Sequence, residues 1–155
     1  MATYTEGERK PTMTDLIGDA GLLFVFDGWC GVCSRFVTWA TSHDRAGRVR
    51  ALPNQTPGLT AVLGLTRADV ERAAWAFTRD GERLSGAAAI NRTLAVLGRR
   101  PWSRLARLYD VPGLGWWEER CYAWFAQHRG RFARWGERPA CAAPATRCIP
   151  EGEAA

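Results

Sequence analysis

The sequence predicts an α/β protein: a three-layer sandwich with a central mixed sheet and an added C-terminal helical segment. Short apolar runs alternate with helical patterns over residues 21–98, in the order strand, helix, strand, helix, strand, strand, helix. From residue 102 onward the chain is helical and aromatic. A chain of 155 residues can bury one core. We therefore expect one domain over 18–135, a mobile leader or short lead-in helix over 1–17, and a loose tail over 136–155.

The first strand is an unbroken apolar run, residues 21–26, of the kind that is buried on both faces of a sheet. Asp27-Gly28 ends this strand, and a helical pattern follows to about Ser42. Residues 48–52 alternate between polar and apolar, which predicts a second strand. A strand–helix–strand unit implies that these two strands are parallel neighbours.

A short helix over 58–63 and a β-hairpin follow. Thr66 and Asp69 have the spacing of a capping box, which predicts that another short helix begins there. Residues 74–78 and 82–84 flank an Asp-Gly turn and predict the hairpin.

Three further helices complete the prediction. Ser85 is in place to cap a helix over 86–97. The aromatic segment then predicts one helix over 102–109 and a longer one over 116–135, with a break at Pro112.

Two cysteines, Cys30 and Cys33, lie where the first strand ends and its helix begins. The first turn of a helix has unpaired N–H groups and a partial positive charge, which stabilise a thiolate and lower its pKa. Because the thiolate is the attacking species in disulfide exchange, we assign Cys30 as nucleophile and Cys33 as resolving thiol. The alternative is a soft-metal site for zinc or copper(I), but no second close pair of cysteine or histidine residues is present.

The segment from Asp27 to Cys33, Asp-Gly-Trp-Cys-Gly-Val-Cys, resembles the signature of the DCC family, predicted thiol–disulfide oxidoreductases with a thioredoxin-like fold. Asp27, Cys30 and Cys33 match the Asp-Cys-Cys motif of that family. A second segment resembles the family at Tyr122, Ala126 and Arg129. The resemblance covers roughly residues 21–145 and implies thiol–disulfide exchange without a bound cofactor. Thioredoxins carry a cis proline just before the third strand, and this chain has no proline there.

Several further side chains are candidates for the site. Asp27 either accepts the proton of Cys33 or only stabilises the turn as an Asx-turn carboxylate. Trp29, Gly31 and Val32 are candidate substrate contacts beside the cysteines.

Residues outside the CxxC segment are further candidates. The N–H groups of the helix that begins after Ser85 and Gly86 could hold a carboxylate of glutathione, a candidate co-substrate, although an ordinary cap is the simpler interpretation. Tyr122 and Arg129 could approach the active site from the C-terminal helix, but we expect them to tie that helix to the domain by packing and hydrogen bonds. Of the other cysteines, Cys121 is expected to be a buried thiol and Cys141 is a candidate third redox cysteine, while Cys148 is unassigned.

Composition excludes some classes of partner. The net charge is +5, but no nucleic-acid motif is present and acidic residues are spread along the chain. The first residues lack the apolar segment of a signal peptide, which predicts a reducing cytoplasm. We therefore expect a monomer that acts on a protein or small-molecule disulfide or dithiol. The alternative is a partner-binding or peripheral membrane module, although the Trp, Phe and Arg pattern of the last helix is more often core and rim.

Overall fold

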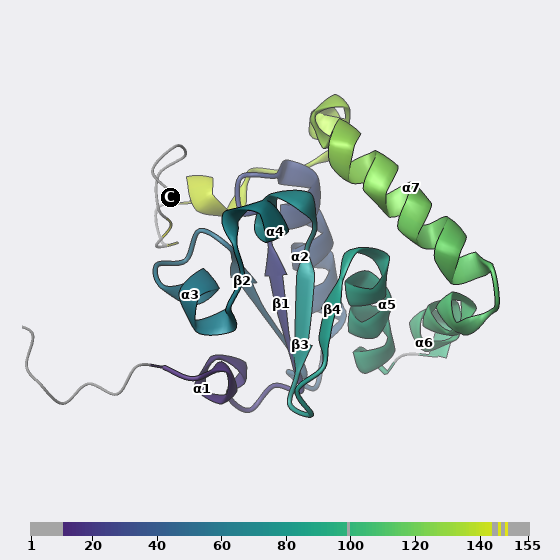
Figure 1. Cartoon of the computed structure of the whole chain (residues 1–155), viewed down its shortest axis with the longest axis horizontal. Helices are drawn as coiled ribbons and strands as arrows, with labels where there is room; N and C mark the ends of the chain where they lie inside the picture. Colours follow the sequence, from purple (N-terminus) through teal and green to yellow (C-terminus); the bar gives the residue numbers. More distant parts are fainter. Residues whose placement is uncertain (1–10, 99, 144–145, 147, 149–155) are drawn as a thin grey trace, which may run out of the picture.

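A four-stranded mixed sheet lies at the centre of the protein (Figure 1). The computed structural model describes residues 11–98, 100–143, 146 and 148. The strands are β1 (Leu22–Phe26), β2 (Val49–Pro53), β3 (Trp75–Thr78) and β4 (Arg83–Ser85), in the order β2-β1-β3-β4. β1 and β2 are parallel, and β3 is antiparallel to both β1 and β4. The predicted mixed sheet, with its parallel pair and its hairpin, is confirmed.

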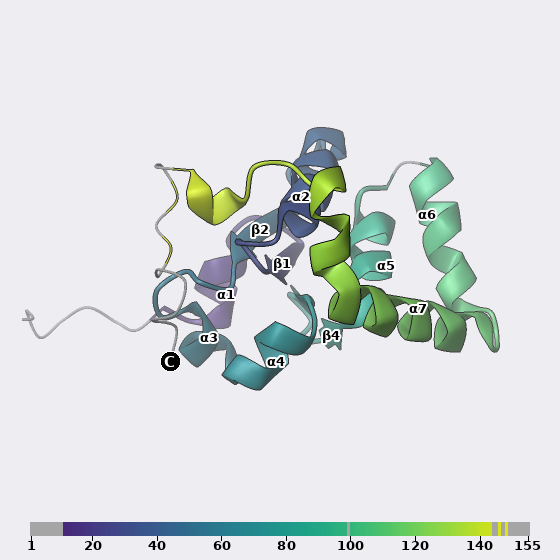
Figure 2. The same ribbon diagram turned by 90° about the horizontal axis from the view of Figure 1, so that it is seen from above.

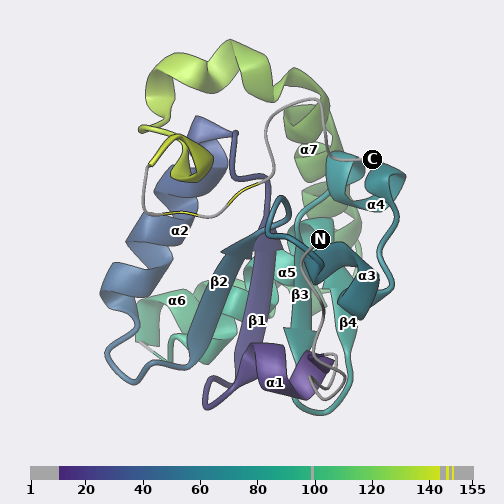
Figure 3. The same cartoon turned by 90° about the vertical axis from the view of Figure 1, so that its left-hand side faces the viewer.

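Helices cover both faces of the sheet. They are α1 (Met13–Ile17), α2 (Gly31–His43), α3 (Leu59–Leu63), α4 (Arg67–Arg72), α5 (Gly86–Val96), α6 (Arg100–Ala106) and α7 (Leu114–His128). Figure 3 shows α1 and α3 in front of the sheet, with α5 and α6 behind it. Within the described residues, none of the helices has both the length and the apolar character needed to cross a bilayer.

The alternation of side chains along β1 divides the core into two parts. Leu22, Phe24 and Phe26 pack toward α2, α5 and α6. Leu23 and Val25 point to the opposite face, toward α1 and α3. All five residues are buried, which confirms the prediction of a strand covered on both sides and holds the end of β1 firmly in place.

Both ends of the predicted domain differ from the structure. The segment Met13–Ile17 forms α1, which confirms the lead-in helix of the two alternatives for this part of the chain. Ile17 is buried in the core, so the domain begins before residue 18. The first ten residues of the expected leader lie outside the described residues. At the other end, Cys141 is buried in a short 3-10 helix, Ala140–Ala142. The expectation of a loose tail from residue 136 is therefore wrong for residues 136–143, because this segment makes tertiary contacts described below.

Two of the predicted helices end earlier than the sequence pattern suggests. α6 ends at Ala106, and a 3-10 helix, Arg107–Asp110, continues the chain. α7 ends at His128 and is followed by another 3-10 helix, Arg129–Trp135. The tighter 3-10 geometry places side chains differently around the axis than an α-helix does. The helical periodicity that predicts one helix over 116–135 therefore does not predict which way Arg129 faces.

Candidate active site

The two cysteines occupy the first turn of α2, directly after the loop that ends β1. Cys30 is the N-cap residue, with an extended backbone (φ −83°, ψ 112°). Its Sγ accepts a hydrogen bond from the backbone N–H of Cys33 at 3.3 Å. The sulfur thus takes the place that a Ser, Thr, Asp or Asn side-chain oxygen often fills, and it satisfies one of the N–H groups that helix geometry leaves unpaired.

This environment makes Cys30 acidic. A hydrogen bond with the side chain of Cys33 is the main cause, and the Cys33 backbone N–H and the Arg129 guanidinium act in the same direction. Partial burial and the charge of Asp27 oppose them. The net result lowers the pKa of the Cys30 thiol to about 6. At neutral pH Cys30 is therefore mostly thiolate.

Cys33 has the opposite character. It packs against the core beneath α2 and is more deeply buried than Cys30. Its hydrogen bond to Cys30 raises the pKa of the Cys33 thiol strongly, and burial and the Cys30 charge raise it further. The pair therefore contains one thiolate and one thiol, as the assignment of an attacking and a resolving cysteine requires.

Asp27 is held by three groups at the end of β1. Its Oδ1 accepts hydrogen bonds from the Trp29 backbone N–H at 3.0 Å and from Gln55 Nε2 at 2.8 Å. Its Oδ2 forms an ion pair with Arg129 Nη1 at 3.0 Å. The bond to Trp29 is the Asx-turn contact, so the structural role considered for Asp27 is present. Arg129 does more than anchor its helix, because its guanidinium lies close enough to both Asp27 and Cys30 to act on the site.

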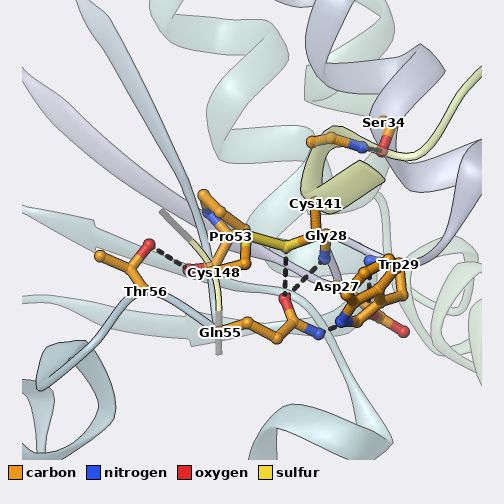
Figure 4. The surroundings of a disulfide bond; sticks show 10 residues. Asp27, Gly28, Trp29, Ser34, Pro53, Gln55, Thr56, Cys141 and Cys148 are labelled. Atoms are coloured by element: carbon orange, nitrogen blue, oxygen red, sulfur yellow. Dashed lines mark hydrogen bonds between the residues drawn. A yellow bond between two sulfur atoms is a disulfide. The ribbon is translucent and has the colours of Figure 1, made fainter. Parts of the chain in front are cut away.

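Gln55 was not predicted as a site residue, and it links Asp27 to the rest of the loop. Figure 4 shows its amide between Asp27 and Gly28. Gln55 Nε2 donates to Asp27, and Gln55 Oε1 accepts from the Gly28 backbone N–H at 2.9 Å. A signal for this contact is available in the sequence: residues that follow two adjacent parallel strands meet at the same edge of a sheet. Gln55 follows β2, and Asp27 follows β1.

The segment 135–141 crosses the beginning of α2, and we call it the strap. Glu137 N donates to Gly31 O at 3.2 Å, and Arg35 Nη1 donates to Trp135 O at 2.8 Å. A Cβ on Gly31 would lie 2.7 Å from Glu137 O, so glycine is required for this close approach. The strap therefore covers one side of Gly31, which was predicted as a substrate contact.

The strap ends at a disulfide between Cys141 and Cys148. Cys141 N donates to Gly28 O at 3.0 Å, and a Cβ on Gly28 would lie 2.4 Å from Cys141 Sγ. Cys141 Sγ also lies 3.7 Å from Gln55 Oε1 (Figure 4). The disulfide is thus packed directly on the loop that carries Asp27 and leads to Cys30.

The N-terminus of α5 is capped by a side chain from α7. Ser85 is the N-cap residue, but its side chain makes no capping hydrogen bond. Glu119 from α7 takes that role: its carboxylate accepts from Ala87 N at 3.3 Å and from Ala88 N at 2.9 Å. A Cβ on Gly86 would lie 2.7 Å from Glu119 Oε2. The predicted N-cap position of Ser85 is therefore confirmed, but its side chain does not make the capping hydrogen bond. The N–H groups of Ala87 and Ala88, considered for a carboxylate of glutathione, are already paired with Glu119.

Tyr122 contacts the backbone at the start of β3. Its hydroxyl accepts a hydrogen bond from Ala74 N at 2.8 Å. Burial raises the pKa of Tyr122, which keeps the hydroxyl neutral. No cis peptide bond occurs in the described residues. The residue just before β3, where the sequence has no proline, thus has an N–H that is paired with Tyr122.

Trp29 and Val32 are half-buried, and the indole N–H of Trp29 is buried without a hydrogen-bond partner. Cys121 is exposed on α7, so the prediction of a buried thiol is wrong. Among the described residues, no three Cys, His, Asp or Glu side chains lie close enough together to hold a metal ion.

The family model described as DCC1-like thiol-disulfide oxidoreductase matches residues 24–135, which include both cysteines, Asp27, Gln55 and Arg129. No curated protein and no solved structure matches the chain.

Proposed function

Because this chain belongs to the DCC1-like thiol-disulfide oxidoreductase family, we propose that it exchanges disulfides through Cys30 and Cys33. The observation that carries the proposal is the hydrogen bond from the Cys33 backbone N–H to Cys30 Sγ at the N-terminus of α2. This contact holds an acidic thiol in the position where a helix stabilises negative charge.

In the first step, the Cys30 thiolate attacks one sulfur of a substrate disulfide. A bond forms between Cys30 Sγ and that sulfur, the substrate S–S bond breaks, and the other substrate sulfur leaves as a thiolate. In the second step, Cys33 loses its proton and attacks Cys30 Sγ. This releases the second substrate thiolate and leaves a Cys30–Cys33 disulfide. Two electrons pass to the substrate, and the reverse sequence oxidises a dithiol.

The two pKa values favour this order. Cys33 is a poor nucleophile while Cys30 is a thiolate, because the hydrogen bond to Cys30 and the Cys30 charge both raise the pKa of Cys33. Forming the mixed disulfide neutralises Cys30 and removes both causes. Cys33 then becomes easier to deprotonate at the moment when its attack is required. Asp27 is the nearby carboxylate that we assign as acceptor of this proton.

We also infer a thioredoxin-like fold for the domain. The order β2-β1-β3-β4, the parallel pair β1 and β2, and the position of the CxxC at the start of α2 support this inference. The substrate that we propose is a protein or small-molecule disulfide, acted on by a single chain that carries all the site residues. The cytoplasmic location stays a prediction. Disulfides such as Cys141–Cys148 are more common in proteins of oxidising compartments.

Trapping tests the proposal directly. Cys33→Ser should accumulate a mixed disulfide between Cys30 and a model disulfide substrate, because the intermediate has no fast exit, whereas Cys30→Ser should form none. Cys121→Ser is the control, since it removes an exposed thiol outside the CxxC motif. Mass spectrometry of unreduced peptides identifies the adduct. Turnover of the model disulfide by Cys30→Ser at the parental rate would refute the mechanism.

A further inference from the structure

The outer surface of α7 carries exposed tryptophan side chains that the site does not use. All the large, well-exposed apolar side chains of the described chain lie between Leu105 and Trp135. On α7 they include Trp116, Trp117 and Trp124, with exposed fractions of 59%, 62% and 54%. This exposure excludes a core position for the three tryptophans and leaves the rim or a binding face. Exposed apolar area of this kind marks a surface that binds something.

These side chains share one face of the helix with a basic residue. Trp117, Arg120 and Trp124 are spaced by three and four residues, which places them on the same side. The Arg120 guanidinium lies 5.1 Å from the ring centroid of Trp116, at cation–π distance. We call Trp116, Trp117, Arg120 and Trp124 the Trp face. Figures 1 and 2 show α7 along the outside of the molecule, beyond α5.

The Trp face carries no carboxylate. α7 contains two acidic residues, and both are engaged elsewhere: Glu118 accepts a hydrogen bond from Asn91 Nδ2, and Glu119 caps α5. Arg131, just beyond the end of the helix, is also exposed. The segregation of charge is therefore complete along α7, with acidic groups inward and basic and indole groups outward.

We propose that the Trp face binds the surface of a membrane that contains anionic phospholipid. Indole rings are enriched at the boundary between headgroups and acyl chains, where an apolar body and a polar N–H are both satisfied. Arginine on the same face is attracted to anionic headgroups. An amphipathic helix with this distribution lies in the plane of the interface with its apolar side chains buried.

Two other partners fit the face less well. In a symmetric dimer built on α7, the basic groups of one copy would face those of the other, with no carboxylate on the face to compensate them. A single-stranded nucleic acid would need ring faces on which bases can stack. The Trp116 and Trp117 rings instead meet edge to face, at 84°, and the neighbouring Val111 and Leu114 are exposed aliphatic side chains that offer no stacking surface.

Sedimentation with vesicles tests the proposal on the full chain. The parent should co-sediment with vesicles of equal parts phosphatidylcholine and phosphatidylglycerol, and much less with phosphatidylcholine alone. Lipids brominated on their acyl chains should quench its tryptophan fluorescence. A basic residue near an anionic surface contributes about 1 kcal/mol, or about fivefold in partition. Arg120→Glu should therefore weaken binding by at least about fivefold. Arg45→Glu, an equal charge change at an exposed residue after α2, should change it less than about twofold.

The double variant Trp117→Ser/Trp124→Ser should lose vesicle binding and quenching, while its circular dichroism and its Cys30 alkylation rate stay at parental values. Three outcomes overturn the proposal. One is equal sedimentation of parent and double variant. Another is no preference for anionic vesicles. The third is that the parent does not bind vesicles but forms a dimer, or a complex with single-stranded DNA, and that the double variant abolishes this association.

Discussion

The acidity of Cys30 can be attributed to one contact by comparing two substitutions of Cys33. Cys33→Ala removes the side-chain hydrogen bond that is the main cause of the low Cys30 pKa, and it keeps the backbone N–H and Arg129. Cys33→Ser keeps a side-chain donor at the same position. We therefore expect the pKa of Cys30 to stay near 6 in Cys33→Ser and to rise in Cys33→Ala toward its ordinary value of 9.0.

The size of the effect follows from the thiolate fraction. With a pKa of about 6, roughly nine-tenths of Cys30 is thiolate at pH 7, whereas with a pKa of 9.0 about one-hundredth is. The rate of Cys30 alkylation at a single pH understates the difference in thiolate fraction, because a thiolate of higher pKa is intrinsically more nucleophilic. The pH at which the rate is half-maximal is the proper measure.

The assay is alkylation of Cys30 by iodoacetamide from pH 4.5 to 10, followed by mass spectrometry of the Cys30 peptide. Peptide mapping separates Cys30 from Cys121, which is exposed and also reacts. In Cys33→Ala the midpoint should lie above about pH 7. A midpoint near 6 in all three proteins would refute the reasoning, because it would mean that the helix N-terminus and the backbone N–H suffice.

Three other predictions concern Asp27, Glu119 and the pH dependence of stability. Asp27→Asn should leave the attack by Cys30 intact and slow the release of the reduced substrate by about 10- to 100-fold, since an amide cannot accept the Cys33 proton. Stopped-flow fluorescence separates the attack phase from the release phase. Equal release rates in parent and variant would leave Asp27 a structural role only. Glu119→Gln should lower the free energy of unfolding by about 1–2 kcal/mol, because the Glu119 carboxylate accepts hydrogen bonds from two N–H groups of α5. Urea titration measures this loss, and the control Glu71→Gln, at an exposed residue, should show none. A loss of equal size in the control would remove the capping explanation. Folding lowers the pKa of the Cys30 thiol. The contribution of the Cys30 thiolate to stability should therefore be lost as pH falls through about 6 and be complete above 9.0. The reduced parent should therefore gain stability relative to Cys30→Ser between pH 6 and 9, and a constant difference in urea midpoint would contradict the lowered pKa.

The order of strands and helices, and the position of the CxxC motif within it, follow from the sequence alone. Residues 21–26 form an unbroken apolar run, Thr66 and Asp69 make the predicted capping box, and the Asp-Gly turn joins β3 to β4. Each signal is local, since it depends on residues within about one turn of helix or one strand of each other. The place of Cys30 at the start of a helix is a local property of the same kind.

The surroundings of the cysteines depended on tertiary structure. Arg35 and Trp135 are a hundred residues apart in the sequence, and the Asp27–Gln55 and Asp27–Arg129 contacts also join distant segments. Glu119 replaces Ser85 as the cap of α5 for the same reason, because a carboxylate from another helix can reach the same N–H groups. Periodicity along one segment states which residues share a face, but not what that face meets. Packing between segments therefore decided which groups surround Cys30, and which tryptophans of α7 stay in contact with solvent.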